Sequence, residues 1–257
     1  MTMNSMSKLS GENFECFPLE WDTEYFGVKS ARVILKGIVS EEEQDNILEY
    51  CKESDFTTIS NVGNLKHNNY WIGRKSDVFL SDLNIQFTKR INGEPEFIDE
   101  FTEVHNAYQR NEQVVNIARS AFQYSRFFND PALPREQAQN IYVHWTKCAF
   151  EQTDKYFVIT KRNDEVAGYL LFSIDKANSI ATIELIAVDE QFRGQRVGKS
   201  LISGLESYIH KKGIENIKVG TQVDNVTATQ FYIACGFQYV SCSSVYHLWM
   251  DRENDDK

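Results

Sequence analysis

Residues 185–200 combine residue types that could bind a phosphate. An apolar run suited to a strand, 185–188, is followed by a short polar turn and by a glycine-bearing stretch that opens an amphipathic helical pattern. The first amides of a helix lack internal partners, and the helix dipole favours an anion there. Arg193, Arg196 and Lys199 add positive charge to a chain whose formal net charge is −10. Spacing alone is equally compatible with an ordinary strand–helix connection containing two turn glycines.

A second patterned segment follows at residues 225–237, with the sequence Asn-Val-Thr-Ala-Thr-Gln-Phe-Tyr-Ile-Ala-Cys-Gly-Phe. Asn225 is a residue type that caps helix starts, and Gly236 is a type that ends helices. Between the two segments the spacing predicts a helix and then a strand at 216–222. The buried stripe predicted for that helix is Leu201, Ile202, Leu205, Tyr208 and Ile209. The second half of the chain therefore reads as strand, loop, helix, strand, helix.

Together the two segments resemble the GNAT acetyltransferases, whose cofactor loop reads Arg or Gln, two residues, Gly, one residue, then Gly or Ala. Arg193 and Gly198 occupy the outer positions of that pattern, and Arg196 stands where the middle glycine is usual. Because an arginine avoids positive φ, we expect the loop geometry to differ locally at Arg196. The resemblance implies a mixed α/β GNAT fold in the C-terminal half, with acetyl-CoA as co-substrate and no metal.

The same resemblance implies which residues hold the cofactor: backbone groups of the strand, the loop with the start of the following helix, and two positions of the later helix. These residues are Ile186, Ala187, Val188, Arg193, Gly194, Gln195, Arg196, Val197, Gly198, Lys199, Ser200, Asn225 and Phe231.

Two side chains are candidates for proton transfer. The motif match assigns Tyr232 as general acid, because a phenol with an ordinary pKa of about 10 stays protonated at neutral pH and can donate to a departing thiolate. Glu184 lies two residues before Ile186 in the predicted strand, so it shares that face and could accept a proton from the acceptor ammonium. Both residues could instead be structural, as a core tyrosine and an ion-paired strand residue. No His, Asp or Glu cluster has metal-ligand spacing.

A narrower resemblance extends to the N-terminal part. Residues 18–31, which include Trp-Asp-Thr-Glu-Tyr-Phe-Gly, and residues 122–127, Phe-Gln-Tyr-Ser-Arg-Phe, are similar to segments of bacterial TDP-fucosamine acetyltransferases. This similarity implies a nucleotide-linked (dTDP) 4-amino-4,6-dideoxy sugar as acceptor, with Arg126 and Trp145 contributing to its site. Another small amine such as an aminoglycoside or polyamine, a protein amine, and a non-catalytic acyl-CoA-binding module remain open as alternatives.

Composition narrows the class of protein. The acidic balance argues against a nucleic-acid binder and against docking on an anionic membrane. Five cysteines without a C-x-x-C pair disfavour a disulfide framework or a thiolate zinc site. No apolar run is long enough to cross a bilayer, and no signal-peptide pattern opens the chain. We therefore expect a cytoplasmic enzyme; the sequence leaves open whether it forms a homodimer.

Turn signals at 91–97 place the expected domain boundary between residues 95 and 96. Residues 1–95 would form a smaller α/β domain that contributes to the acceptor site and that we interpret as a degenerate half-GNAT. Residues 96–257 would form the GNAT domain. Within it we expect helices at 98–108, 114–123 and 135–150 and a hairpin across residues 162–165. Ser40 and Glu43 predict a capping box at a helix start, and the charged tail 251–257 is expected to be frayed.

Overall fold

The computed structural model describes residues 6–75 and 77–250. The expected frayed tail lies outside these residues. The chain divides into two compact units: the first comprises residues 1–85, 125–138 and 241–257, and the second comprises residues 86–124 and 139–240. Two long strands, β5 (Val78–Arg90) and β11 (Gln238–Trp249), contribute residues to both units. This interleaved division differs from the expected single boundary between residues 95 and 96.

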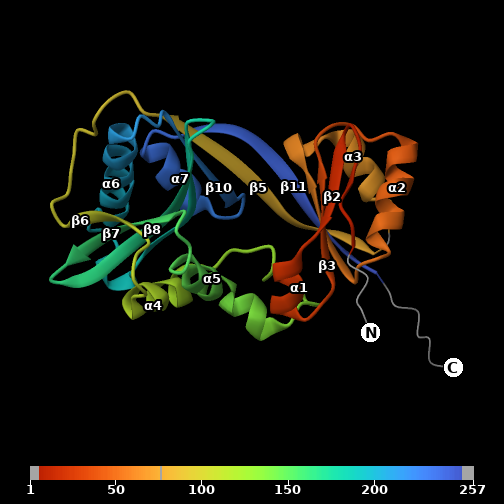
Figure 1. Cartoon of the computed structure of the whole chain (residues 1–257), viewed down its shortest axis with the longest axis horizontal. Coiled ribbons are helices and arrows are strands. Elements are labelled where there is room, and N and C mark those ends of the chain that lie inside the picture. Colours follow the sequence, from red (N-terminus) through yellow and green to blue (C-terminus); the bar gives the residue numbers. More distant parts are fainter. Residues whose placement is uncertain (1–5, 76, 251–257) are drawn as a thin grey trace. The chain divides into compact units, whose positions relative to one another are not determined.

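The first unit carries four further strands and three helices, of which Figure 1 labels β2, β3, α1, α2 and α3. They are β1 (Leu9–Ser10), β2 (Phe14–Pro18), α1 (Glu20–Phe26), β3 (Ser30–Leu35), α2 (Glu41–Cys51), β4 (Phe56–Asn61) and α3 (Lys66–Ile72), with a short 3-10 turn at Val62–Asn64. Strand β3 pairs in parallel with β4 from Ser30–Phe56 to Leu35–Asn61, and β11 pairs antiparallel with β4 on the other side. The crossover between the parallel strands is α2.

One face of this first sheet packs against α2 and α3. The buried residues there include Val33, Leu35, Ile47, Ile59 and Leu248. The capping box predicted at the start of α2 is confirmed, because the Ser40 hydroxyl accepts from the Glu43 amide and the Glu43 carboxylate accepts from the Ser40 amide. Two orphan amides of the helix are thereby satisfied.

The second unit contains five strands wholly its own and four helices. They are β6 (Thr102–Asn106), α4 (Glu112–Ala121), α5 (Arg135–Ala149), β7 (Lys155–Arg162), β8 (Glu165–Asp175), β9 (Ile180–Val188), α6 (Val197–Lys211), β10 (Asn216–Gln222) and α7 (Val226–Ala234), with a 3-10 turn at Glu190–Phe192; the first residues of α5 belong to the first unit. The strand order is β10-β9-β8-β7-β6, and only the β9–β10 pair among them is parallel. The sheet is therefore mixed, with parallel and antiparallel pairs, and the unit has the expected α/β fold.

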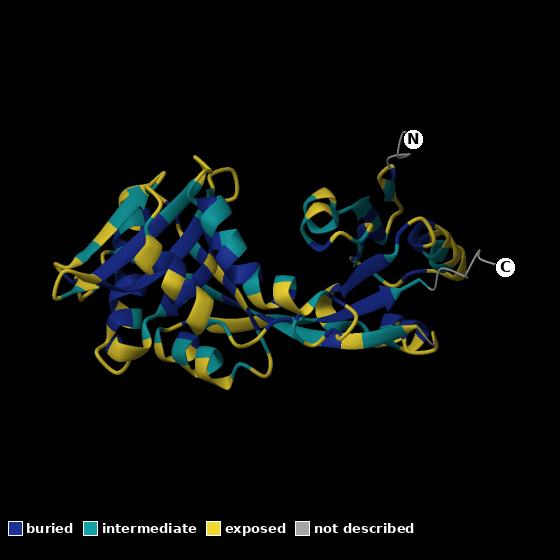
Figure 2. Cartoon of the chain, turned by 90° about the horizontal axis from the view of Figure 1, so that it is seen from below, coloured by how far each residue is buried: buried dark blue, intermediate teal, exposed yellow. Residues whose placement is uncertain are grey.

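Helix α6 lies on this sheet through the predicted stripe, of which Leu201, Ile202, Leu205 and Ile209 are buried. Figure 2 shows the buried residues concentrated in the strands of each unit, with exposed residues on the outer helix surfaces and loops. Close approach of α6 depends on Gly204, since a Cβ there would lie 2.7 Å from Thr102 Cγ2 and 2.9 Å from Val158 Cγ1. All five cysteines are free thiols, as the sequence predicts.

Several elements differ from expectation. The helix predicted at 98–108 is wrong: residues 102–106 form β6, which pairs antiparallel with the edge of β7. Tertiary pairing overrides a weak helical pattern here, and the Thr102 and Thr160 hydroxyls bond at 2.8 Å. Helix α1 occupies Glu20–Phe26, an aromatic stretch for which the sequence predicted no secondary structure. Within the described residues, every helix is too short or too polar to cross a membrane.

Candidate cofactor site in the second unit

Strands β9 and β10 separate partway along their length. Their parallel register runs from Ile180–Asn216 to Ile183–Val219 and stops there within the described residues, although β9 continues to Val188. On its other edge β9 stays paired with β8 as far as Val188, with a register shift that leaves Glu184 as the extra residue of a β-bulge. Ile186, Ala187 and Val188 therefore present a backbone edge that β10 does not cover.

The loop that follows β9 delivers the chain to the N-terminus of α6. Gly194 has φ 79°, and Arg196, the N-cap of α6, has φ 62° and ψ 10°. Our expectation that Arg196 would avoid positive φ is wrong, because the position that usually holds glycine keeps its left-handed conformation here. Arg193, Arg196 and Lys199 are exposed, and none of them forms an ion pair with another described residue. Their charges and the first amides of α6 together give this helix start a positive potential, which favours an anion.

A buried ionic network fixes the first turn of α6. The Ser200 hydroxyl donates to Asp99 Oδ2 at 2.5 Å, and Arg162 Nη2 donates to the same oxygen at 2.5 Å. Burial alone would raise the pKa of Asp99, but the hydrogen bonds from Arg162 and Ser200 outweigh it and hold that pKa below its usual value. Ser200 lies in the first turn of α6, next to the loop. Its hydroxyl is bonded to Asp99 and so fixes that turn. Asp99 and Arg162 lie far from the loop in sequence, and no local pattern marked them.

Helix α7 brings the second predicted segment to the loop. A Cβ on Gly198 would lie 3.0 Å from Phe231 Cε2 and 3.1 Å from its Cζ, so the Phe231 ring packs directly on the glycine. The Asn225 side chain accepts from the Ala228 amide at 3.1 Å, which confirms the predicted cap. The helix ends before Gly236, whose φ is 84°. The structure thus joins the two segments that the sequence singled out.

Tyr232 lies on α7 with a ring that is 3% exposed. Phe87, Phe231 and Phe237 surround it, with ring centroids 5.5–5.9 Å away. Burial raises the pKa of Tyr232, and the nearby Cys235 raises it further. The phenol therefore stays protonated throughout the neutral and mildly alkaline range and remains able to donate.

Glu184 is committed to an ion pair. Its Oε1 lies 2.5 Å from Lys155 Nζ, and the Lys155 and Glu184 side chains are 18% and 28% exposed. A proton-accepting role for Glu184 would have to operate beside this cation, and it stays a prediction.

Of the two residues expected to contact the acceptor, Arg126 belongs to the first unit, where its guanidinium lies 4.1 Å from the Phe127 ring centroid. Trp145 belongs to the second unit, where it packs edge-on against Tyr142 at 5.3 Å. Across the described residues, no group of three or more His, Cys, Asp and Glu side chains could hold a metal.

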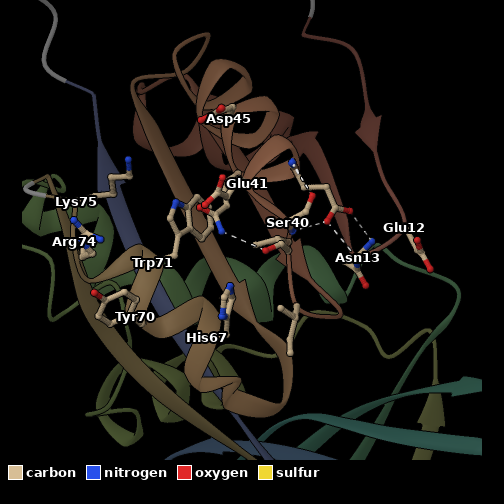
Figure 3. A pocket seen from close by; sticks show the side chains of 14 residues that line it. Glu12, Asn13, Ser40, Glu41, Asp45, His67, Tyr70, Trp71, Arg74 and Lys75 are labelled. Atoms are coloured by element: carbon tan, nitrogen blue, oxygen red, sulfur yellow. Dashed lines mark hydrogen bonds between the residues drawn. The ribbon is translucent and has the colours of Figure 1, made fainter.

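The first unit has a groove at the start of its own crossover helix, α2, which corresponds in topology to α6. The groove lies between the start of α2 and helix α3 (Figure 3). Its volume is about 900 Å³, and Ser40, Glu41 and Trp71 line it. The first turn of α2 carries Glu41, Glu42 and Glu43. Carboxylates at this point oppose a phosphate, whereas the first turn of α6 has no acidic residue.

The left-handed Arg196 generates a stability prediction. Arg196→Gly and Arg196→Ala both remove the charge, but only glycine adopts this conformation without a Cβ clash. We expect the Gly variant to exceed the Ala variant by about 1 kcal/mol in free energy of unfolding, measured by urea denaturation. An Ala variant as stable as the Gly variant would show that residue 196 does not hold a positive φ.

Comparisons with known proteins agree with this geometry. Residues 111–237 match the acetyltransferase (GNAT) family. The chain is 31% identical over 142 residues to the spore coat polysaccharide biosynthesis protein SpsD of Bacillus subtilis, covering 55% of this chain and 48% of SpsD. The aligned regions span about half the length of the curated relatives that the chain matches.

Two solved structures resemble the fold of nearly the whole chain. A GCN5-related N-acetyltransferase from Sphaerobacter thermophilus has a TM-score of 0.62 at 9% identity, covering 92% of this chain and 76% of that one. A tandem GNAT protein from the clavulanic acid biosynthesis pathway has a TM-score of 0.58 at 12% identity, covering 88% and 76%. The chain therefore has the mixed α/β fold of the GNAT acetyltransferases, and the segment that matches the family model contains the open β9 edge, the α6 loop and α7.

Proposed function

We propose that the chain is an acetyl-CoA-dependent N-acetyltransferase that acts on a primary amine by direct transfer. The observation that carries this proposal is the uncovered edge of β9 ending at the N-terminus of α6. An extended pantetheine arm carries amide groups that can pair with backbone groups of Ile186 to Val188, as a further strand would. The pyrophosphate then meets the amides that open α6 and the charges of Arg193, Arg196 and Lys199.

Several cofactor contacts follow from this placement. Gly194, Gln195, Val197, Gly198 and Lys199 supply the loop and first-turn amides, and Ser200 holds the turn through Asp99. Phe231 supports Gly198 from α7, and Asn225 fixes the start of that helix. The cofactor contacts of these residues are proposals supported by the local geometry of the second unit.

The chemistry requires a neutral amine as the nucleophile. The amine nitrogen forms a bond to the acetyl carbon, the carbon–sulfur bond breaks, and the departing thiolate takes a proton. Tyr232 is suited to provide that proton, because its raised pKa keeps the phenol protonated. The proton lost by the amine passes to solvent or, by way of water, to Glu184.

The acceptor proposal is a nucleotide-linked amino sugar. It is supported by the resemblance of residues 18–31 and 122–127 to TDP-fucosamine acetyltransferases and by the similarity to a protein of spore coat polysaccharide biosynthesis. Arg126 and Trp145 remain our candidates for contacts with that acceptor. A cationic small amine is the second candidate, because the chain's net charge of −10 would attract it.

Tyr232→Phe tests the general acid. We expect kcat to fall by about 10²–10⁴ with little change in acetyl-CoA affinity, as measured by thiol release and calorimetry. Tyr239→Phe is the matched control, since Tyr239 is 60% exposed and its loss of a hydroxyl should leave kcat unchanged. Because the pKa of Tyr232 is raised, wild-type kcat should show no loss from its ionisation up to pH 9. Equal kcat in wild type and Tyr232→Phe would remove Tyr232 from the mechanism.

A panel of amines tests the acceptor. With acetyl-CoA saturating, we expect thiol release to be fastest with a dTDP-4-amino-4,6-dideoxyhexose of one C4 configuration and slow with aminoglycosides, polyamines and peptide amines. Faster turnover of a simple amine than of any nucleotide sugar would contradict the acceptor assignment and favour the second candidate. Absence of turnover with every amine, together with tight acetyl-CoA binding, would instead indicate a binding module.

A further inference from the structure

Three polar residues form a row across the sheet of the first unit, on the face opposite α2 and α3. Arg32 on β3 lies beside Thr58 on β4, and Thr58 lies opposite His247 on β11. Residues paired in register point to the same face of a sheet. The alternate residues Val33, Ile59 and Leu248 belong to the apolar core on the other face. A polar row thus occupies a position where the strand pattern would otherwise supply a second apolar layer.

Each residue of the row has a buried polar atom without a hydrogen-bond partner among the described residues. These atoms are Arg32 Nε, Thr58 Oγ1 and His247 Nε2. Thr58 and His247 are 1% and 0% exposed, and Arg32 is half-buried with its Nη2 3.4 Å from Ser60 Oγ. An unsatisfied buried polar group costs stability, so three of them in register point to a polar group that the described residues do not supply.

The hydrogen bonds around His247 define what it can accept. Its Nδ1 lies 2.6 Å from Asp130 Oδ2, which also accepts from Trp249 Nε1 at 3.0 Å. Burial lowers the pKa of His247 more than the bond to Asp130 raises it, so the ring is neutral. Since the Asp130 carboxylate can only accept, Nδ1 carries the hydrogen and Nε2 carries a lone pair. The row therefore requires a hydroxyl or other donor at His247.

The opposite end of the row is cationic. Burial raises the pKa of Asp22 on α1, and the charges of Arg126 and Arg32 oppose that rise, which places both guanidinium groups near this carboxylate. Arg126 also lowers the pKa of His247, so its charge acts on both Asp22 and the ring of His247. Arg32 thus gives this end of the row a guanidinium group, and guanidinium groups favour phosphate oxygens.

We propose that Arg32, Thr58 and His247, with Arg126, form a binding site for a phosphorylated sugar. The phosphate lies at Arg32 and Arg126, and a sugar hydroxyl donates to His247 Nε2 while Thr58 donates to a sugar oxygen. The site opens at Arg32, its half-buried member. This assignment rests on the proposed function, because it identifies the part of the chain that recognises a nucleotide-linked sugar.

Adjacent threonines on β4 provide a matched pair of variants for the test. Thr57 is fully buried on the opposite face, with its Oγ1 2.8 Å from Ser54 Oγ, whereas the Thr58 hydroxyl is unpartnered. Calorimetry with dTDP-glucose, which carries a diphosphate and hydroxyls but no amine, reads binding without catalysis. We expect Thr58→Val to bind this probe about 3–10-fold more weakly with an unchanged melting temperature. Thr57→Val should keep the affinity and lower the melting temperature by roughly 2–4 °C.

Arg32→Met keeps the apolar stem of the side chain and should weaken binding of dTDP-glucose by about 10-fold or more. The affinity for free dTDP should change less than the affinity for dTDP-glucose in Thr58→Val. Equal probe affinity in wild type and Thr58→Val, or equal loss of stability in the two threonine variants, would overturn the site. Such a result would leave acetyl transfer to the amine panel unaffected, so failure of the site and failure of the proposed function are distinguishable. Wild-type protein that does not bind dTDP-glucose or dTDP also overturns it.

Discussion

The point at which β9 and β10 stop pairing, after Ile183 and Val219, is the constraint on which the second unit's site depends. Beyond it, β8 is the only strand among the described residues that pairs with β9, and the other edge of β9 keeps backbone donors and acceptors that a ligand can satisfy. The bulge at Glu184 lies at the same place and turns the strand. Everything downstream is positioned by that separation: the loop, the positive helix start of α6, and α7 packed on Gly198 through Phe231.

The first unit repeats the order of strand, helix, parallel strand and helix but lacks this separation. Strands β3 and β4 stay in register to Leu35 and Asn61, so no backbone edge opens between them. Its crossover helix begins with three glutamates, whose charges oppose a phosphate. Both differences support a single acetyl-CoA site per chain. The polar row of Arg32, Thr58 and His247 gives this unit a different chemical capacity on its other face.

Local signals predicted the elements whose ends are fixed by neighbouring residues. The Ser40 capping box, the Asn225 cap and the hairpin turn at Asn163 and Asp164, both with positive φ, need only short-range contacts. Long-range pairing decided the rest. Strand β6 pairs with the edge of β7, and Arg196 is left-handed although its residue type disfavours that conformation. The Asp99–Ser200 bond and the Arg32–Thr58–His247 row join residues far apart in the chain, so no local spacing could reveal them.

The central claim is that the uncovered β9 edge and the start of α6 bind CoA. Hydrogen exchange of the backbone amides, with and without CoA, tests it most directly, because each amide reports its own protection. The account predicts new protection in peptides covering residues 186–200 and the start of α7, absent in Gly198→Asp, where a carboxylate would lie beside the pyrophosphate. Protection confined to the α2–α3 groove of the first unit, or no protection at all, would contradict it.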